Sequence, residues 1–82
     1  MYKAQVFVTL KPSILDPQGS AIKKGLLSLG FNDVADVRMG KYLEVSFEAS
    51  NKEQALQTIE EMCKKLLANP VIEDYRFQLV EE

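Results

Sequence analysis

The chain has 82 residues, enough for one compact domain over residues 1–82, and a domain of this size buries only about 60% of its unfolded surface. Its formal net charge is −2, and its 10 basic residues are spread out, which argues against a nucleic-acid binder. The sequence has no histidine, no phosphate-binding loop and no metal-binding spacing of cysteines, so we expect no catalysis from this chain alone.

The first predicted element is a strand over residues 3–10. Apolar side chains alternate with others in this stretch, and one face carries Ala4, Val6, Val8 and Leu10. An alternation of period two is typical of a half-buried strand. Pro12 follows and ends the strand, because proline cannot donate a hydrogen bond to a neighbouring strand.

A helix is predicted next, over residues 17–29. Asp16 can accept a hydrogen bond as its N-cap, and Pro17 suits the first helical position. Apolar residues then recur at helical spacing: Ile22, Leu26 and Leu29. Gly30 can adopt the left-handed conformation that ends many helices, with Phe31 in contact with the last turns as in a Schellman motif.

The middle of the chain predicts a β-hairpin. Residues 34–39 alternate as a second strand, Gly40-Lys41 suits a tight turn, and residues 42–48 form a third strand. The inward positions of the third strand are Leu43, Val45 and Phe47.

A second helix is predicted over residues 51–68 and a fourth strand over 71–80. Ser50 and Glu53 have the spacing of a capping box, and Asn69-Pro70 stops the helix. The apolar stripe of this helix consists of Ala55, Ile59, Met62, Cys63 and Leu66. The strand alternates again, with Val71, Tyr75, Phe77 and Leu79 on one side.

This order of elements predicts an α+β fold of the ferredoxin-like, split βαββαβ type, with two helices on one face of a four-stranded antiparallel sheet. The other face of that sheet, called the open face below, would show Gln5, Phe7, Thr9, Tyr42, Glu44 and Ser46. Aromatic Phe7 and Tyr42 among polar residues indicate an interaction surface. Self-association through this face and pairing of edge strands are both compatible with the pattern.

Three stretches are more particular than the fold requires. They are Leu10-Lys11-Pro12 with Leu15-Asp16-Pro17-Gln18-Gly19, then Val37-Arg38-Met39-Gly40-Lys41, and finally the stretch from Leu66 to Tyr75 with Asn69-Pro70 at its centre. In this order and on these elements they resemble the PurS family, the small subunit of phosphoribosylformylglycinamidine synthase. The resemblance covers essentially the whole chain.

The resemblance implies a non-catalytic subunit in purine biosynthesis. In such a complex a large synthetase (PurL-like) subunit uses ATP, with Mg²⁺, to convert formylglycinamide ribonucleotide into its amidine. A glutaminase (PurQ-like) subunit supplies the ammonia. The small subunit bridges the two as a homodimer, or as a higher even oligomer, and assists ammonia transfer. No cofactor is then expected on this chain.

Some residues are candidates for contacts with these partners or with a second copy. Gln18 is not needed for a helix cap, so a contact role is open beside an ordinary surface role. Arg38 and Lys41 flank the predicted turn, where charges are usually only solvated, and the resemblance makes them candidates for docking on the larger subunits. Phe7 and Tyr42 complete this set.

Other sequence features concern the cell compartment and the single thiol. Cys63 cannot form an internal disulfide, which fits a reducing compartment, and we expect a cytoplasmic protein. No apolar run approaches the ~18 residues that a membrane helix needs. Because Cys63 lies on the apolar stripe of the second helix, we expect it to be buried and inert.

Three other interpretations share the predicted topology. An ACT-type module that binds a small molecule would use a pocket near a glycine turn, and Gly40 is available without a cluster of polar ligands. An RNA-recognition domain would need basic residues beside Phe7 and Tyr42, whereas Glu44 lies there. An acylphosphatase-like enzyme would need an arginine loop after the first strand, where the chain has only Lys11 before Pro12. We rank them in that order, below the PurS-like subunit.

Overall fold

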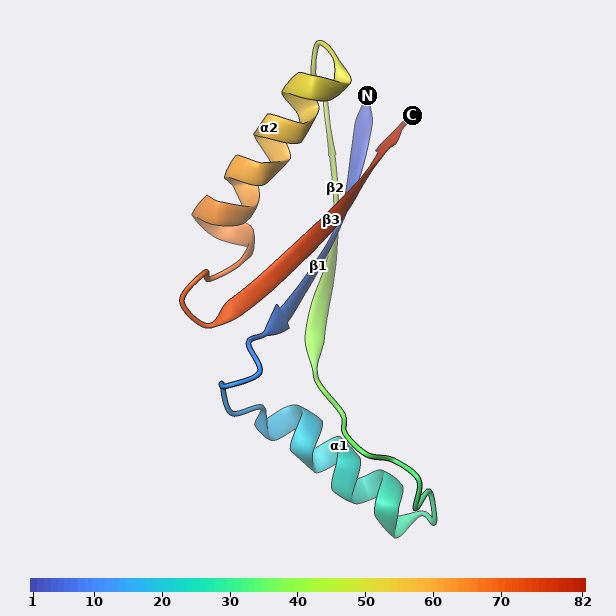
Figure 1. Cartoon of the computed structure of the whole chain (residues 1–82). Coiled ribbons are helices and arrows are strands. Elements are labelled where there is room, and N and C mark those ends of the chain that lie inside the picture. Colours follow the sequence, from blue (N-terminus) through green and yellow to red (C-terminus); the bar gives the residue numbers. More distant parts are fainter.

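The three strands of the chain form one antiparallel sheet, shown in Figure 1 as part of a computed structural model that describes all residues, 1–82. The strands are β1 (Tyr2–Leu10), β2 (Gly40–Phe47) and β3 (Glu73–Glu81), in the spatial order β2-β1-β3. The helices are α1 (Pro17–Ser28) and α2 (Lys52–Met62), and α2 continues into a π-helical turn at Cys63–Leu67. The predicted α+β class and both helices are confirmed. None of the helices is long and apolar enough to cross a membrane.

The centre of the core is the face of β1 that the alternation predicted. Ala4, Val6 and Val8 are almost completely buried, and Val6 pairs with Leu43 on β2 and Phe77 on β3. Helix α2 lies over this face and contributes Ala55 and Ile59, and the π-helical turn contributes Cys63; all three are likewise buried. The inward residues predicted for the strands of the hairpin and the C-terminus pack around this cluster: Leu43, Val45, Phe47, Tyr75, Phe77 and Leu79. Val71, also predicted to point inward, precedes β3 and is exposed.

Helix α1 begins and ends as the sequence predicts. Asp16 is its N-cap, and the Asp16 carboxylate accepts a hydrogen bond from the Gly19 N–H at 3.0 Å. At the other end Gly30 has φ = +97°, a conformation that glycine adopts without strain. The Phe31 N–H donates to the Leu26 carbonyl at 3.0 Å and the Gly30 N–H to the Leu27 carbonyl at 3.1 Å. These two bonds define a Schellman motif.

Helix α2 begins one residue later than the predicted capping box. Its N-cap is Asn51, whose side chain accepts from the Gln54 N–H at 2.8 Å, while the Gln54 side chain accepts from the Ser50 N–H at 2.9 Å. The prediction of Ser50 with Glu53 is therefore wrong, because Asn caps a helix as well as Ser and Gln54 supplies the returning bond. The π-helical turn also shifts the apolar stripe, and Leu66, predicted to lie on it, is 83% exposed.

The predicted second strand, residues 34–39, does not form, so the four-stranded sheet is wrong for a single chain. The chain reverses directly after α1, runs back beside the helix, and enters β2 at Gly40 without a further reversal (Figure 1). Gly40 pairs with Thr9 inside the sheet, and a Cβ there would meet the Val8 carbonyl oxygen at 2.5 Å. Glycine at position 40 therefore serves a close approach of two strands and not the predicted tight turn.

Helix α1 does not lie on the sheet, and the prediction of two helices on one face is wrong for this chain. It extends beyond the end of the sheet (Figure 1), and the molecule measures 51 × 27 × 14 Å. Its radius of gyration is 16.3 Å, whereas a compact chain of this length has about 12 Å. Apolar residues of α1 and its C-terminal end remain exposed, Ile22 at 41% and Leu29 at 76%. One copy thus leaves a helix and part of a sheet without a partner.

Candidate functional site

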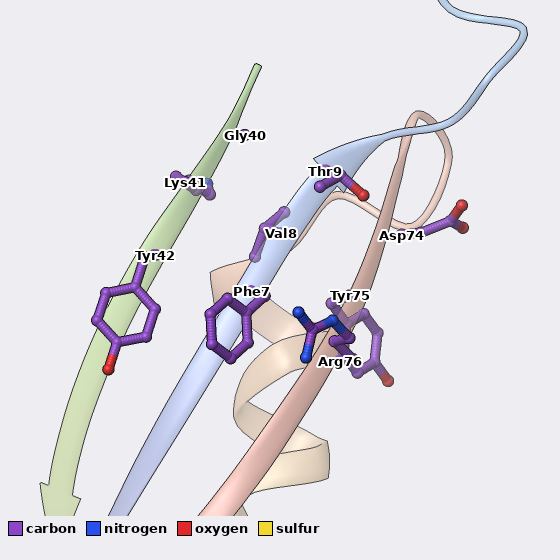
Figure 2. A pocket seen from close by; sticks show the side chains of 9 residues that line it. All are labelled: Phe7, Val8, Thr9, Gly40, Lys41, Tyr42, Asp74, Tyr75 and Arg76. Carbon is purple, nitrogen blue, oxygen red and sulfur yellow. The ribbon is translucent and has the colours of Figure 1, made fainter. Parts of the chain in front are cut away.

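The open face of the sheet carries an aromatic and cationic cluster at its centre. Phe7 on β1 pairs with Tyr42 on β2 and with Arg76 on β3. The Phe7 and Tyr42 ring centroids are 5.0 Å apart, and Arg76 Cζ lies 4.1 Å from the centroid of Phe7. Figure 2 shows the three side chains in a row across the strands. No helix covers them, so the cluster is available to a partner.

A shallow hollow of about 390 Å³ surrounds this cluster. The Tyr42 hydroxyl donates to the Glu44 carboxylate at 2.8 Å, and this hydrogen bond raises the pKa of Tyr42. Asp74, at the rim, is ion-paired with Lys11 at 3.1 Å. These side chains offer stacking, a cation–π contact and hydrogen bonds, and they suit recognition better than acid–base chemistry.

Of the residues predicted from sequence, the structure brings Phe7 and Tyr42 into contact, and Lys41 lines the rim of the same hollow. Lys41 pairs with Val8, so the alternation of β2 places its side chain toward the opposite face. Gln18, in the first turn of α1, lines a different hollow together with Gly40 and Lys41. Contacts of these residues with partners stay predictions.

Arg38 has a structural role that the sequence analysis did not predict. Its guanidinium donates to the carbonyl oxygens of Leu10 at 3.3 Å, Lys11 at 2.9 Å and Ile14 at 3.4 Å. The side chain thereby ties the segment before β2 to the end of β1. It is therefore not merely a solvated residue beside a turn.

The same region contains a second connection, and together the residues Asp16, Gly19, Arg38 and Met39 are called the junction below. Besides the Gly19 N–H, the Asp16 carboxylate accepts the Met39 N–H at 2.7 Å. Asp16 is only 6% exposed, and hydrogen bonds from Met39 and Gly19 lower the pKa of its carboxyl. A Cβ on Gly19 would clash with the Val37 carbonyl oxygen, so the backbone segments meet closely here. The junction fixes where α1 begins relative to β2.

The lowered pKa of Asp16 predicts a stabilising effect that depends on pH. A carboxyl with a folded-state pKa below its ordinary value, 3.8, contributes fully above that value and loses its contribution as pH falls through the folded pKa. We expect the free energy of unfolding to fall more steeply below pH 4 in the unmodified protein than in Asp16→Asn. Urea unfolding of both proteins from pH 6 to pH 3 measures this, and parallel curves would contradict it.

A second uncovered surface is apolar and lies between α2 and β2. It is a groove of about 310 Å³, called the α2 groove below, lined by Val45, Thr58, Glu61, Met62, Lys65, Leu66 and Leu67. Six of its seven lining residues come from α2 and the π-helical turn, and Val45 of β2 is the one contributed by the sheet. Val45 and Met62 lie on faces that were predicted to point inward, so part of this groove was visible in the alternation.

The thiol of Cys63 takes no part in either surface. It is fully buried under α2, as predicted, and burial raises its pKa. Among the described residues no group of three or more histidine, cysteine, aspartate or glutamate side chains is placed to hold a metal ion. Arg76 is the functional candidate that the sequence analysis missed, although the alternation with Phe77 could have placed it on the open face.

Comparison with known proteins gives a consistent result. The family model PurS, described as phosphoribosylformylglycinamidine (FGAM) synthase, matches residues 3–81. The phosphoribosylformylglycinamidine synthase subunit PurS of Bacillus subtilis is 53% identical, over 99% of this chain and 95% of its own. A solved structure of Methanocaldococcus jannaschii PurS matches with a TM-score of 0.88 and 45% identity, over 100% and 99% of the two chains. A chain in the structure of PurLQS from Thermotoga maritima matches with a TM-score of 0.88 and 32% identity, over 96% of both.

Proposed function

Since the chain belongs to the PurS family, and is thus a subunit of FGAM synthase in purine biosynthesis, we propose that it acts by assembly. It forms a homodimer that bridges a glutaminase and a large synthetase subunit, and it assists the passage of ammonia between them. ATP and Mg²⁺ belong to the large subunit in this proposal. Family membership favours this function over an ACT-type regulatory module.

Two uncovered apolar surfaces of the single chain support the proposal. They are the apolar side of α1 and the α2 groove. The groove is apolar and lies where a ferredoxin-like fold would place its first helix. The chain's own α1 points away from it, with Ile22 and Leu29 exposed. The α1 of a second copy fits the groove, and two-fold symmetry makes the exchange reciprocal.

Residues 34–39 would complete the same exchange. They are extended and lead directly into β2, whose outer edge has no neighbouring strand. When the corresponding segment of a second copy pairs with that edge, each sheet gains its fourth strand. The predicted ferredoxin-like sandwich with four strands and two helices on one face then arises from two chains and not from one.

The open face would remain available to the larger subunits after this exchange. Phe7, Tyr42 and Arg76 are of the residue types enriched in interface centres, and a polar rim surrounds them. Lys41 and Gln18 lie beyond one end of this cluster, beside the hollow that they share. A subunit that holds the glutaminase against the synthetase shortens the path of ammonia, and it needs no catalytic group for that role.

Reconstitution with the two larger subunits tests this function. We expect the isolated chain to release no ammonia from glutamine and to hydrolyse no ATP. Adding it to the partners should raise glutamine-dependent amidine synthesis by at least about tenfold, because bridging raises the effective concentration of one site at the other. Synthesis driven by ammonium chloride should depend on it less. Equal glutamine-dependent rates with and without the chain would contradict the proposal.

A further inference from the structure

We propose that the junction of Asp16, Gly19, Arg38 and Met39 is the device that holds the chain open for exchange. It keeps the segment 34–39 from folding back beside β2, and it thereby directs α1 toward a second copy. This inference rests on the proposed exchange and adds its cause. The cause is a small set of hydrogen bonds at two hinges, which are the connections before and after α1.

The junction and a closed hairpin compete for one hydrogen-bond donor, the Met39 N–H. In a hairpin closed at Gly40-Lys41, Met39 and Tyr42 would be the hydrogen-bonded pair next to the turn, and the Met39 N–H would be donated to Tyr42. In the structure that N–H is donated to the Asp16 carboxylate at 2.7 Å. The bond to Asp16 and the closed hairpin therefore exclude each other.

Gly40 would lie in the turn of a closed hairpin. Two-residue hairpin turns require φ > 0 at their first central position, and in this chain only Gly30 has a positive φ. Gly40 instead pairs with Thr9 as the first residue of β2. A residue suited to a turn is thus held in an extended strand.

Arg38 connects the two hinges through its hydrogen bonds. The first hinge is the connection after β1, and its Leu10, Lys11 and Ile14 carbonyl oxygens all accept from the guanidinium of Arg38. The second hinge is the segment that carries Arg38 itself, directly before β2. One side chain therefore couples the two connections that must open together when α1 leaves its sheet.

The free energies of the closed monomer and the exchanged dimer differ mainly at the hinges. A closed monomer and an exchanged dimer bury α1 in the same kind of groove, so the contacts of α1 favour neither form at equal coverage. The difference between the forms lies in the hinges and in the concentration of the chain. Hydrogen bonds that exist only when the hinges are open therefore shift the equilibrium toward the dimer.

The test compares the unmodified protein with Asp16→Asn/Arg38→Ala, and with Asp33→Asn as the matched control. Asp33 lies in the same connection between α1 and β2, but its exposed side chain makes no hydrogen bond or ion pair in the structure. Sedimentation over a range of concentrations gives the dimer dissociation constant. Isotope-filtered NMR on labelled and unlabelled protein that were unfolded and refolded together shows whether contacts between α1 and β2 methyl groups are intermolecular.

The double variant loses the three hydrogen bonds of Arg38 and one of the two bonds to Asp16. We expect its dissociation constant to rise by at least about tenfold, a factor that the net contribution of one or two such bonds already reaches. Its monomer should show Met39–Tyr42 cross-strand contacts and intramolecular contacts between α1 and β2. The Asp33→Asn control should dissociate like the unmodified protein. A double variant whose dissociation constant stays within about twofold of the unmodified protein overturns the role of the junction.

Two further outcomes are also decisive. Should the double variant lose its helical circular dichroism, Arg38→Lys replaces it, since lysine keeps the charge without the planar fork that reaches several carbonyls. Unchanged dissociation of Arg38→Lys then overturns the inference. If the unmodified dimer shows no intermolecular contacts between α1 and β2, the exchange itself is wrong, independently of how the junction variants behave.

Discussion

Replacing Ile22 and Leu26 by aspartate will leave the protein monomeric at concentrations where the proposed exchange makes the unmodified protein a dimer. Both side chains lie on the apolar stripe of α1, which meets no part of its own sheet. Burying two carboxylates in an apolar groove without partners should weaken association by at least roughly a hundredfold. Glutamine-dependent activity of the reconstituted complex should fall with it.

Lys24→Asp is the matched control for this result. It places a carboxylate on the same helix, but about half a turn away from the stripe of Ile22 and Leu26. Sedimentation and helical circular dichroism of both variants are the measurements. A dimer of unchanged affinity in the double variant would show that α1 lies outside the self-association interface.

The second large effect is expected at Ile59, which is fully buried between α2 and β1. Ile59→Ala leaves a cavity in the core, at a cost of about 2–5 kcal/mol. A chain of this length has a total stability of only about 4–12 kcal/mol. We therefore expect the variant to lose a large part of its resistance to urea.

Leu56→Ala is the control, because it removes the same number of carbon atoms from a side chain that is 40% exposed on the same helix. Urea unfolding at one fixed protein concentration compares the two, since association contributes to stability. Similar losses in both variants would mean that the core is not centred on Ile59.

Local features of the fold could be predicted because they depend on neighbouring residues only. The alternation of Ala4, Val6 and Val8 identifies the buried face of β1, and Asp16 and Gly30 mark the ends of α1. Each of these follows from the geometry of one strand or one helix end. The error at the start of α2 was one residue, since Ser50 and Asn51 are both good caps.

The position of α1 could not be predicted, because an apolar stripe shows which side of a helix is buried and not which chain buries it. The same limit explains the missing strand at residues 34–39, whose alternation has no partner within one chain. Part of the candidate site was predicted from the alternation of the strands: Phe7 and Tyr42 meet on the open face as expected. Arg38 was not, since its three acceptors lie 24 to 28 residues away in the sequence.

The displacement of α1 from its sheet also determines how long an assembly lasts. In an exchanged dimer the two chains cannot part unless each gives up a helix and a strand from the other's core. Separation then requires the partial unfolding of both chains, so its rate follows the unfolding barrier rather than the loosening of a surface contact. With the proposed exchange, a subunit that has once paired would therefore keep its first partner through many turnovers of the enzyme that it serves.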